Sequence, residues 1–465
     1  MTGSYKLNVD LELLKKYNRP GPRYTSYPTA PQFSEDFGSS DFRAEIVDSN
    51  KVANAPNLSL YFHIPFCRSL CYFCACNTII THSQERVEKY LADLKEEIDL
   101  LSGLISPGRK VVQLHWGGGT PTYLTPNQIK GLSLYIRDRF DIVDDAEIAM
   151  EIDPRGLDSR HLPTIREVGF NRVSFGVQDF DPRVQEAVNR VQPEGLSRDV
   201  VKTSRELGFE SINIDLVYGL PYQTVESYTR TLDKIIDISP DRLAVFNWAY
   251  VPWLKKHQRV IPQEALPATG DRLRLLKLII EKLTGAGYVY IGMDHFAKPD
   301  DELALALENR SLYRNFQGYS TRADAEVYGM GVTSISQLRN VYAQNTKDTK
   351  IYGDELSQNR IPTHIGYRLS DDDKLRRHVI TELMCNGVVV KSDVGDQYGI
   401  DFDAYFADSI AKLDEFVGDG LLTISPDRIE VQGAGRLVIR NIAMVFDRYL
   451  DQSGDGSKST YSRTV

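Results

Sequence analysis

The chain has 465 residues, of which 42% are hydrophobic and 26% are charged, and its formal net charge is -9 at pH 7. This length allows two or three domains with enough core to fold without disulfides, and the acidic balance argues against a general nucleic-acid partner. No stretch approaches the roughly 18 apolar residues of a membrane span, and the N-terminus lacks the apolar core of a secretory signal. We therefore expect a cytoplasmic protein with neither a nucleic-acid nor a membrane partner.

From about residue 57 the sequence alternates short β-rich runs with amphipathic helical stretches. The near-continuous apolar character of the runs is typical of parallel strands that are buried on both faces. The expected strands cover 58–64, 111–116, 147–153, 172–177, 211–219, 242–250 and 288–293. The expected helices include 84–104, 125–140 and 271–283. This repeated βα order predicts an α/β fold with a full or partial TIM-like barrel.

Residues suited to chemistry follow these runs at the points where the strands are expected to end. Four cysteines follow the first run, GGGTPT (117–122) follows the second and EIDP (151–154) closes the third. Gln178 and Asp179 follow the fourth run, and Asp215 lies within the fifth. Because the active sites of such barrels lie at the carboxyl ends of the strands, this arrangement predicts one site there.

The βα alternation stops after about residue 340. Residues 371–450 predict helices, a hairpin at 421–431 and a further helix at 435–450, which together suggest a winged-helix-like module. This segment carries 15 Asp and Glu against 9 Lys and Arg, so a lid or packing role is favoured over DNA binding. We expect an N-terminal substrate-gating segment (1–55), a barrel domain with its extension (56–340) and a mostly helical C-terminal domain (341–465).

The cysteine cluster has the spacing of a metal-cluster loop. Cys67, Cys71 and Cys74 form C-x3-C-x2-C, and Cys76 follows after one further residue. One loop can bring three thiolates to a cubane iron-sulfur cluster, whereas Cys74 and Cys76 are too close in sequence to reach two corners of it easily. One iron then keeps an open position. A zinc site is the alternative, but such sites are usually built from two separated cysteine pairs.

The spacing, its place after the first barrel strand and Phe73 before the third cysteine resemble the radical S-adenosylmethionine superfamily. The resemblance implies that the three cysteines hold a 4Fe-4S cluster whose fourth iron binds S-adenosylmethionine. It also implies that one electron from the cluster cleaves this cofactor to methionine and a 5'-deoxyadenosyl radical, so that no side chain acts as the catalytic group.

Longer motifs, from about residue 17 to the C-terminus, resemble the bacterial oxygen-independent coproporphyrinogen III oxidase family. They are PGPRYTSYPTA (20–30), YFHIPFCRSLCYFCACN (61–77), LHWGGGTPTYL (114–124), EIDPR (151–155), VSFGVQDFDPRVQEAVNRVQ (173–192), INIDLVYGLPYQT (212–224), IGMDHFAKPDDELA (291–304), RNFQGY (314–319) and YSRTV (461–465).

This resemblance implies oxidative decarboxylation of two propionates of coproporphyrinogen III to vinyl groups, which gives protoporphyrinogen IX in haem biosynthesis. It also implies two S-adenosylmethionine molecules, an unidentified electron donor, an unidentified terminal acceptor and a monomeric enzyme.

By position, the resemblance assigns the cluster to Cys67, Cys71 and Cys74. The first S-adenosylmethionine is assigned to Tyr61, Gly117, Gly118 and Glu151, with Phe73 and Thr120 as further cofactor contacts. The second is assigned to Gln178, Arg190, Asp215, Ala249 and Ile335.

The four propionates of the implied substrate call for cations in its pocket. Arg19, Arg23, Arg314 and Arg463 are candidates by composition alone, and for each the alternative is an ordinary solvated surface charge. The N-terminal segment around residues 20–30 is expected to fold over the barrel mouth.

A haem-chaperone-like relative that binds haem is the alternative function. Three features favour the oxidase over this relative. They are Cys76, the RYTSYPTA segment and RNFQGY in place of a haem motif.

Overall fold

The computed structural model describes residues 6–452 and 461–464, and one large sheet dominates it. The strands of this sheet are β1 (Leu58–Ile64), β4 (Lys110–Gly118), β5 (Asp141–Ile152), β6 (Arg172–Gln178), β7 (Ser211–Tyr218), β8 (Arg242–Asn247), β9 (Val289–Gly292), β10 (His295–Ala297), β13 (Glu326–Met330), β14 (Ile335–Gln337), β15 (Val341–Asn345) and β16 (Thr363–Arg368). Their order is β16-β15-β14-β13-β1-β4-β5-β6-β7-β8-β10-β9.

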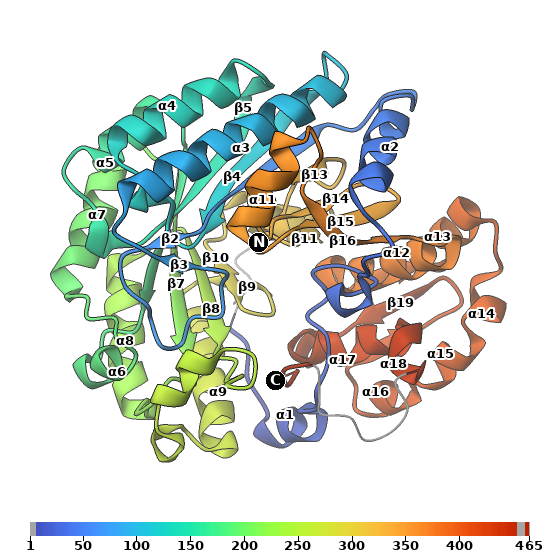
Figure 1. Cartoon of the computed structure of the whole chain (residues 1–465). Helices are drawn as coiled ribbons and strands as arrows, with labels where there is room; N and C mark the ends of the chain where they lie inside the picture. The colour runs from blue at the N-terminus through green and yellow to red at the C-terminus, as the bar shows by residue number, and fades with distance from the viewer. Residues whose placement is uncertain (1–5, 453–460, 465) are drawn as a thin grey trace.

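The six strands from β1 to β8 are mutually parallel and carry the predicted barrel. Helices connect them and form an outer layer on one face of the sheet (Figure 1). They are α3 (Gln84–Leu104), α4 (Pro126–Arg137), α5 (His161–Glu167), α7 (Glu194–Glu206) and α8 (Val225–Ile238), and α9 (Thr269–Gly285) follows β8. The expected α/β fold with a partial (β/α)6-type barrel is confirmed.

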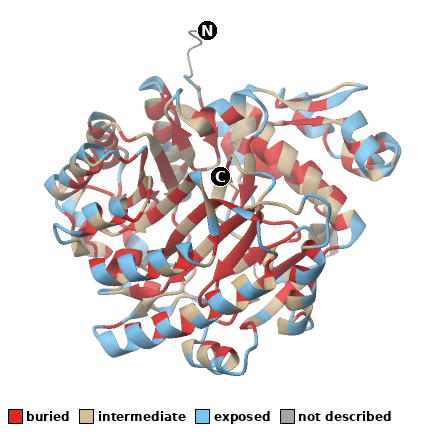
Figure 2. Cartoon of the chain, turned by 90° about the horizontal axis from the view of Figure 1, so that it is seen from above, coloured by how far each residue is buried: buried red, intermediate tan, exposed pale blue. Residues whose placement is uncertain are grey.

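Local sequence explains why these helices form and how they pack. Ser83 caps α3 by accepting a hydrogen bond from the Arg86 amide at 3.3 Å, and Thr125 and Gln128 form a capping box on α4. The inward side chains of α3 recur every three or four residues. Seen from above, the strands form a mostly buried centre, and the exposed residues lie mainly on helices and loops (Figure 2).

The sheet continues beyond the barrel and past residue 340. Strand β13 pairs in parallel with β1, and β14, β15 and β16 then add antiparallel strands as far as Arg368. The proposed division of the chain at residues 340 and 341 stays a prediction, and the large sheet crosses that position.

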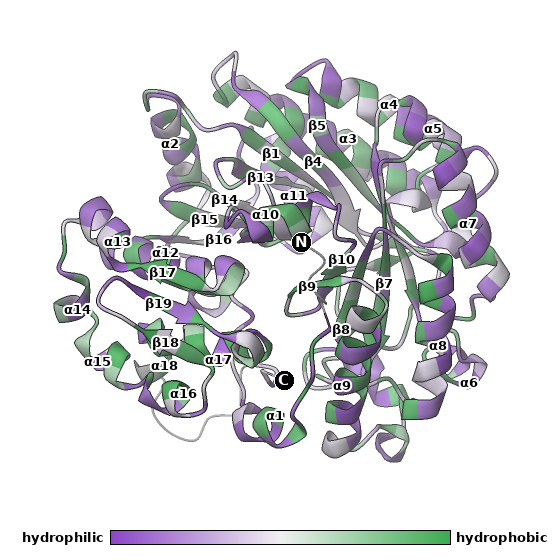
Figure 3. Cartoon of the chain, turned by 180° about the vertical axis from the view of Figure 1, so that it is seen from behind, coloured by the Kyte–Doolittle hydropathy of each residue, from purple (hydrophilic) through white to green (hydrophobic). Residues whose placement is uncertain are grey.

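The C-terminal part combines helices with a small sheet beside the open side of the barrel (Figure 1). Its long helix is α12 (Asp371–Asn386), and α13 (Lys391–Tyr398) follows after the short strand β17 (Val388–Val390). The small sheet has the order β17-β19-β18. The antiparallel pair β18 (Leu422–Ile424) and β19 (Arg428–Val431) is the predicted hairpin, which is thereby confirmed. Apolar and polar residues are interspersed along these elements (Figure 3).

The single helix expected at 435–450 is wrong. The chain forms four short segments there: η6 (Gly433–Val438), α17 (Ile439–Ala443), η7 (Met444–Phe446) and α18 (Arg448–Gln452). A Cβ at Gly435 would lie 2.0 Å from the Leu421 carbonyl oxygen, so tight packing on the hairpin shapes the first segment. Asp447 leaves the helical conformation with ψ 104° and accepts a hydrogen bond from the Tyr24 hydroxyl at 2.9 Å. Tertiary contacts thus override a periodicity that favours one helix.

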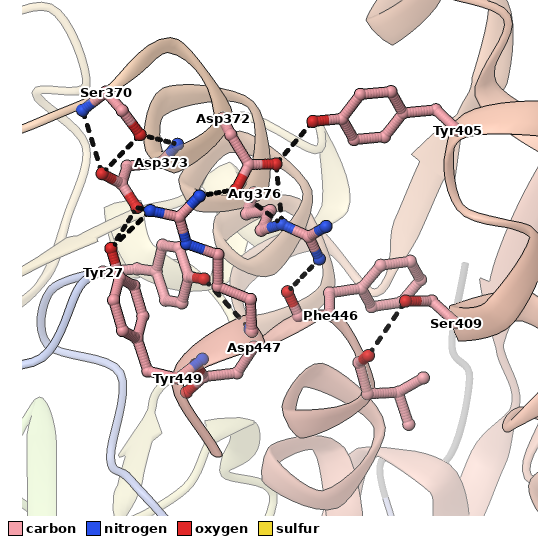
Figure 4. A network of polar contacts seen from close by, with 12 residues as sticks. Tyr27, Ser370, Asp372, Asp373, Arg376, Tyr405, Ser409, Phe446, Asp447 and Tyr449 are labelled. Carbon is pink, nitrogen blue, oxygen red and sulfur yellow. Dashed lines mark hydrogen bonds and ion pairs between the residues drawn. The ribbon is translucent and has the colours of Figure 1, made fainter. Parts of the chain in front are cut away.

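The N-terminal segment is fixed to the C-terminal part by a polar network (Figure 4). The Tyr27 hydroxyl accepts from the Arg448 amide at 3.2 Å, and the Tyr449 hydroxyl donates to Asp373 at 2.7 Å. Asp372 accepts from Arg376 at 2.9 Å in the same network. The gating role expected for residues 20–30 stays a prediction.

Within the described residues, no helix combines the length and the apolar character that crossing a membrane requires.

Candidate cofactor site

The thiol loop begins directly after β1 and is closed on itself by a short parallel pair. Strand β2 (Phe66–Cys67) pairs with β3 (Ile79–Ile80), so the residues between them project as one loop. Cys71 is buried, Cys67 and Cys74 are half-buried, and Cys76 is exposed. The parallel sheet therefore presents all four cysteines at the carboxyl end of its first barrel strand, as the sequence predicts.

These thiols line a cavity of about 180 Å³. Among the described residues, no group of three or more Cys, His, Asp or Glu side chains is close enough to hold one metal ion. Three thiols spread around a cavity instead suit a ligand larger than a single ion, such as an iron-sulfur cluster. This donor set fits the cluster that the sequence implies.

Two guanidinium groups lie beside the buried thiol. Arg155 and Arg190 place a nitrogen 3.5 Å and 3.6 Å from the Cys71 sulfur, respectively. Asp153 bridges the two, at 2.6 Å from Arg155 and 3.2 Å from Arg190. Burial would raise the pKa of Asp153, but the two guanidinium groups hold it at about 2. Two cationic groups therefore lie within reach of the buried thiol of the loop.

The pKa values of two other thiols, those of Cys67 and Cys74, are shifted by their surroundings. Burial raises the pKa of Cys67 to about 11, although the Thr120 hydroxyl, 3.3 Å from its sulfur, opposes this shift. The adjacent Cys76 thiol lowers the pKa of Cys74 below its ordinary value, although burial opposes this shift. Cys76 thus affects a predicted ligand directly.

Glu151 closes β5 and faces the glycine-rich edge of β4. Its carboxylate lies 3.3 Å from His115 Nε2 and accepts from the Gly118 amide at 3.3 Å. Burial opposes ionisation, but the His115 contact outweighs it and lowers the pKa of Glu151. A Cβ at Gly117 would lie 2.9 Å from this carboxyl group, so only glycine leaves room for it. Tyr61 stacks on His115 with ring centroids 5.9 Å apart.

Asp215, Gln178 and Arg190 face the same cavity. Burial and the nearby Glu151 raise the pKa of Asp215 to about 7. Gln178 has a φ of 69°, a strained conformation for this residue type and one that is often found at binding sites. A Cβ at Gly176 would lie 2.7 Å from Gln178 Nε2 and 2.9 Å from Arg190, so Gly176 makes room for both side chains.

Arg190 also has a hydrogen-bond donor without a partner. Its side chain is buried and its Nε atom has no hydrogen-bond partner, while another nitrogen donates to the Gly176 carbonyl at 2.6 Å. Buried polar atoms normally have partners, so this atom is available to a ligand acceptor in the cavity. An anionic group of S-adenosylmethionine, such as its carboxylate, fits this donor.

The structure brings most of the predicted site residues together. The thiol cavity is lined by Cys67, Cys71, Phe73, Cys74, Gly118, Thr120, Glu151, Gln178, Arg190 and Asp215. Gly117 and Tyr61 lie immediately behind Glu151 and His115. Ala249 instead lines a second cavity, and Ile335 packs near Phe33 and Phe316. Of the residues assigned to the second S-adenosylmethionine, Gln178, Arg190 and Asp215 line the thiol cavity. The Ala249 carbonyl accepts from Gln258 Nε2, which also donates to the Phe73 carbonyl of the thiol loop.

Sequence reasoning missed Asp153 and Arg155 as cavity residues, although both lie in the EIDPR motif. It also missed the loop after β8, which holds the thiol loop in place. Trp248 and Gln258 donate to the Phe73 carbonyl at 3.0 Å and 3.1 Å, and His257 donates to the Cys74 carbonyl at 2.8 Å. No local signal marks these partners, because they are about 180 residues apart in sequence.

Comparisons with known proteins agree with this geometry. Residues 61–235 match the radical SAM superfamily, and residues 369–438 match the HemN C-terminal domain. The oxygen-independent coproporphyrinogen III oxidase from Synechocystis is 47% identical over 98% of this chain and 97% of its own length. The enzyme of the same name from Pseudomonas aeruginosa is 46% identical over 98% of both chains. A solved structure of coproporphyrinogen III oxidase (HemN) from Escherichia coli is also similar, and that protein is described as a radical SAM enzyme. The match has a TM-score of 0.91 and 45% sequence identity, and it covers 96% of this chain and 100% of the solved chain. The chain belongs to the oxygen-independent coproporphyrinogen III oxidase family.

Proposed function

We propose that the chain oxidatively decarboxylates two propionates of coproporphyrinogen III to vinyl groups and so forms protoporphyrinogen IX in haem biosynthesis. The observation that carries this function is the near full-length similarity to enzymes named for it. These names support the oxidase and not the haem-chaperone-like alternative. The enzyme is a radical SAM oxidoreductase that uses a 4Fe-4S cluster and S-adenosylmethionine.

The thiolates of Cys67, Cys71 and Cys74 would hold the cluster. The Gly118 edge and Glu151 would bind polar groups of the first S-adenosylmethionine. The Nε of Arg190 would bind an anionic group of the second, and Asp215 would accept from its hydroxyls. When bound, the cluster and this cofactor supply a radical that removes a hydrogen atom from a propionate β-carbon. Asp153, held ionised between two guanidinium groups, keeps Arg155 and Arg190 beside the thiols during each turnover.

The balance of the reaction defines what the rest of the protein must provide. Each propionate loses one hydrogen atom, one electron and carbon dioxide to become a vinyl group. The electron requires an acceptor, and the cluster requires a one-electron donor; both are unidentified. Enclosed walls protect reactive species from water, and the burial of Cys71 and the packing of Phe73 against Trp248 and Tyr72 support this role.

The second cofactor molecule, the oligomeric state and the cellular location are part of the same proposal. The family resemblance implies a second S-adenosylmethionine, and Gln178, Arg190 and Asp215, which line the thiol cavity, would be its contacts. Ala249 and Ile335 would contribute only from neighbouring regions. A cytoplasmic location agrees with the five free cysteines, because a reducing compartment keeps thiols unpaired. The monomeric state is implied by the family resemblance.

The test is anaerobic reconstitution with iron and sulfide, reduction, and incubation with S-adenosylmethionine and coproporphyrinogen III. We expect 5'-deoxyadenosine and vinyl product together, and neither from Cys71→Ala. The matched control is Cys385→Ala, because Cys385 is buried on α12 outside the thiol cavity and should leave both products. Cofactor cleavage by the wild type without vinyl product would contradict the substrate assignment.

A further inference from the structure

A second and larger cavity, of about 510 Å³, lies between the barrel and the C-terminal part. Its volume is typical of sites for small organic ligands. Five parts of the chain form its walls: residues 18–23, the ends of β7 and β8 with the following loop, helix α9, residues 290–294, and residues 436–440 with the tail at 461–464. The thiol cavity and this cavity share no lining residue among those described.

The charged side chains on its walls are mostly positive. Among the described residues that line it, five are arginines and one, Asp294, is a carboxylate. The arginines are Arg23, Arg272, Arg436, Arg440 and Arg463. Asp294 pairs with Arg23, so the other four guanidinium groups face no lining carboxylate.

The hydrogen bonds of these arginines do not neutralise them. Arg440 donates only to backbone carbonyls, those of Gly21, Pro22 and Arg463, and Arg436 donates to the Ile291 carbonyl at 2.8 Å. The buried Nε of Arg272 has no partner.

Arg314 adds positive charge to the same region. It is 93% buried, its Nε and NH1 atoms have no partner, and its guanidinium group lies 4.7 Å from the Tyr319 ring centroid. Burial, then Arg440 and Arg314, lower the pKa of Arg23 to about 9, and burial and Arg314 lower the pKa of Arg440 to about 10. Uncompensated buried cations are costly, so the region is complementary to an anionic ligand.

The remaining walls are largely apolar and aromatic. They include Trp248, Tyr250, Leu273, Leu276, Ile280 and Tyr290. A ligand that fits both features has a broad apolar body and several carboxylates, as a tetrapyrrole with propionate side chains does.

We propose that Arg23, Arg272, Arg436 and Arg440, with Arg314 behind them, bind the two propionates that the substrate keeps. This inference rests on the proposed function, because it takes coproporphyrinogen III as the ligand. A reacting propionate must reach the thiol cavity, which shares no lining residue with the arginine cavity. A guanidinium partner would also stabilise a carboxylate against loss of carbon dioxide. Both points indicate that the arginines bind the propionates that do not react.

Binding of stable, oxidised porphyrins tests the assignment. Coproporphyrin III carries four propionates, and protoporphyrin IX carries only the two that remain after reaction. We would titrate both into the reconstituted full chain by fluorescence, using the wild type, Arg272→Gln and Arg436→Gln. The control is Arg428→Gln, which alters an exposed arginine on β19 away from the cavity walls.

We expect each cavity variant to raise Kd about tenfold or more, by a similar factor for both porphyrins, and the control to change neither. A loss confined to coproporphyrin III would assign the arginines to the reacting propionates instead, and unchanged binding of both would overturn the site. Substitution by lysine should restore part of the affinity, because it restores the charge without the guanidinium geometry.

Turnover separates this inference from the proposed function. Cofactor cleavage by the wild type without vinyl product would contradict the function itself. If the wild type forms vinyl product and Arg272→Gln does so with unchanged KM, only the carboxylate site fails. The variants should keep the cluster signal of the wild type, since neither residue lines the thiol cavity.

Discussion

The two cavities differ in how their charges are compensated. In the thiol cavity Asp153 balances Arg155 and Arg190, and His115 faces Glu151. In the arginine cavity five cations share one carboxylate among the described lining residues. The first site is preorganised for a ligand that carries both signs of charge, and the second is completed only by an anion. Charge balance therefore distinguishes the proposed cofactor site from the proposed carboxylate site.

The cavities also differ in how the chain builds them. The thiol cavity collects the carboxyl ends of neighbouring parallel strands, so its residues follow the barrel in sequence order. The arginine cavity joins both ends of the chain, and one of its contacts, from Arg440 to Gly21, spans 419 residues. The first depends on the sheet and the second on how the terminal segments dock.

The largest expected effect is that of Asp153→Asn on the thiol cavity. Removing this charge leaves two neighbouring guanidinium groups unpaired, which should lower the free energy of unfolding by about 3–5 kcal/mol. Anaerobic denaturant titration measures this change. Asp158→Asn is the control, because Asp158 also pairs with an arginine, Arg160, but is about half exposed. Equal, small losses from both variants would contradict the compensation that we describe.

The next effect concerns pH. Burial raises the pKa of Asp215 to about 7, so its contribution to stability is fully present below its unfolded pKa of about 4 and is lost as pH rises through 7. Unfolding of the ligand-free chain between pH 4 and pH 8 should show this decline, and Asp215→Asn should remove part of it.

Glu97 provides the comparison for that pH dependence. Burial also raises the pKa of Glu97 to about 7, but this residue bonds Tyr352, Asn345 and the Gly331 amide, outside both cavities. Glu97→Gln should remove a separate part of the decline without affecting cofactor cleavage. A slope that neither substitution changes would refute both assignments.

The arginine cavity should respond in the opposite direction to the thiol cavity. Arg314→Met replaces a buried, unpaired cation with an apolar side chain and should raise the free energy of unfolding of the ligand-free chain by about 1–2 kcal/mol. The reason is that the substitution leaves no buried carboxylate without its partner. Thermal unfolding measures the gain, and porphyrin titration should show weaker binding by the same protein. A destabilised Arg314→Met with intact binding would mean that the charge is compensated in the fold.

The smallest effect concerns the loop after β8, which lines the arginine cavity and hydrogen-bonds the backbone of the thiol loop. His257→Ala removes one hydrogen bond to the Cys74 carbonyl and should cost about 1 kcal/mol. We would measure it by unfolding and by the electron paramagnetic resonance spectrum of the reduced cluster, which should shift slightly. Lys256→Ala, at the exposed neighbouring position, is the control and should change neither.

The barrel and the thiol loop were predictable because both have local signals. Strands such as β1 and β6 are buried on both faces and therefore appear as continuous apolar runs, and the spacing of Cys67, Cys71 and Cys74 is itself a ligand pattern. The expected helix at 435–450 was wrong because contacts with Leu421 and Tyr24 decide its breaks. Ala249 and Ile335 were assigned by resemblance, and their part in cofactor binding stays a prediction; neither is among the residues that line the thiol cavity.

Sequence by itself determined the parallel barrel, the three-cysteine loop and the family motifs, since each depends on residues close together along the chain. Only the tertiary structure revealed Asp153 as the bridge between two guanidinium groups, and Arg272, Arg436 and Arg440 as walls of one cavity. Long-range docking creates these groupings. Whether an arginine is a solvated surface charge or an uncompensated buried cation depends on which segments pack around it.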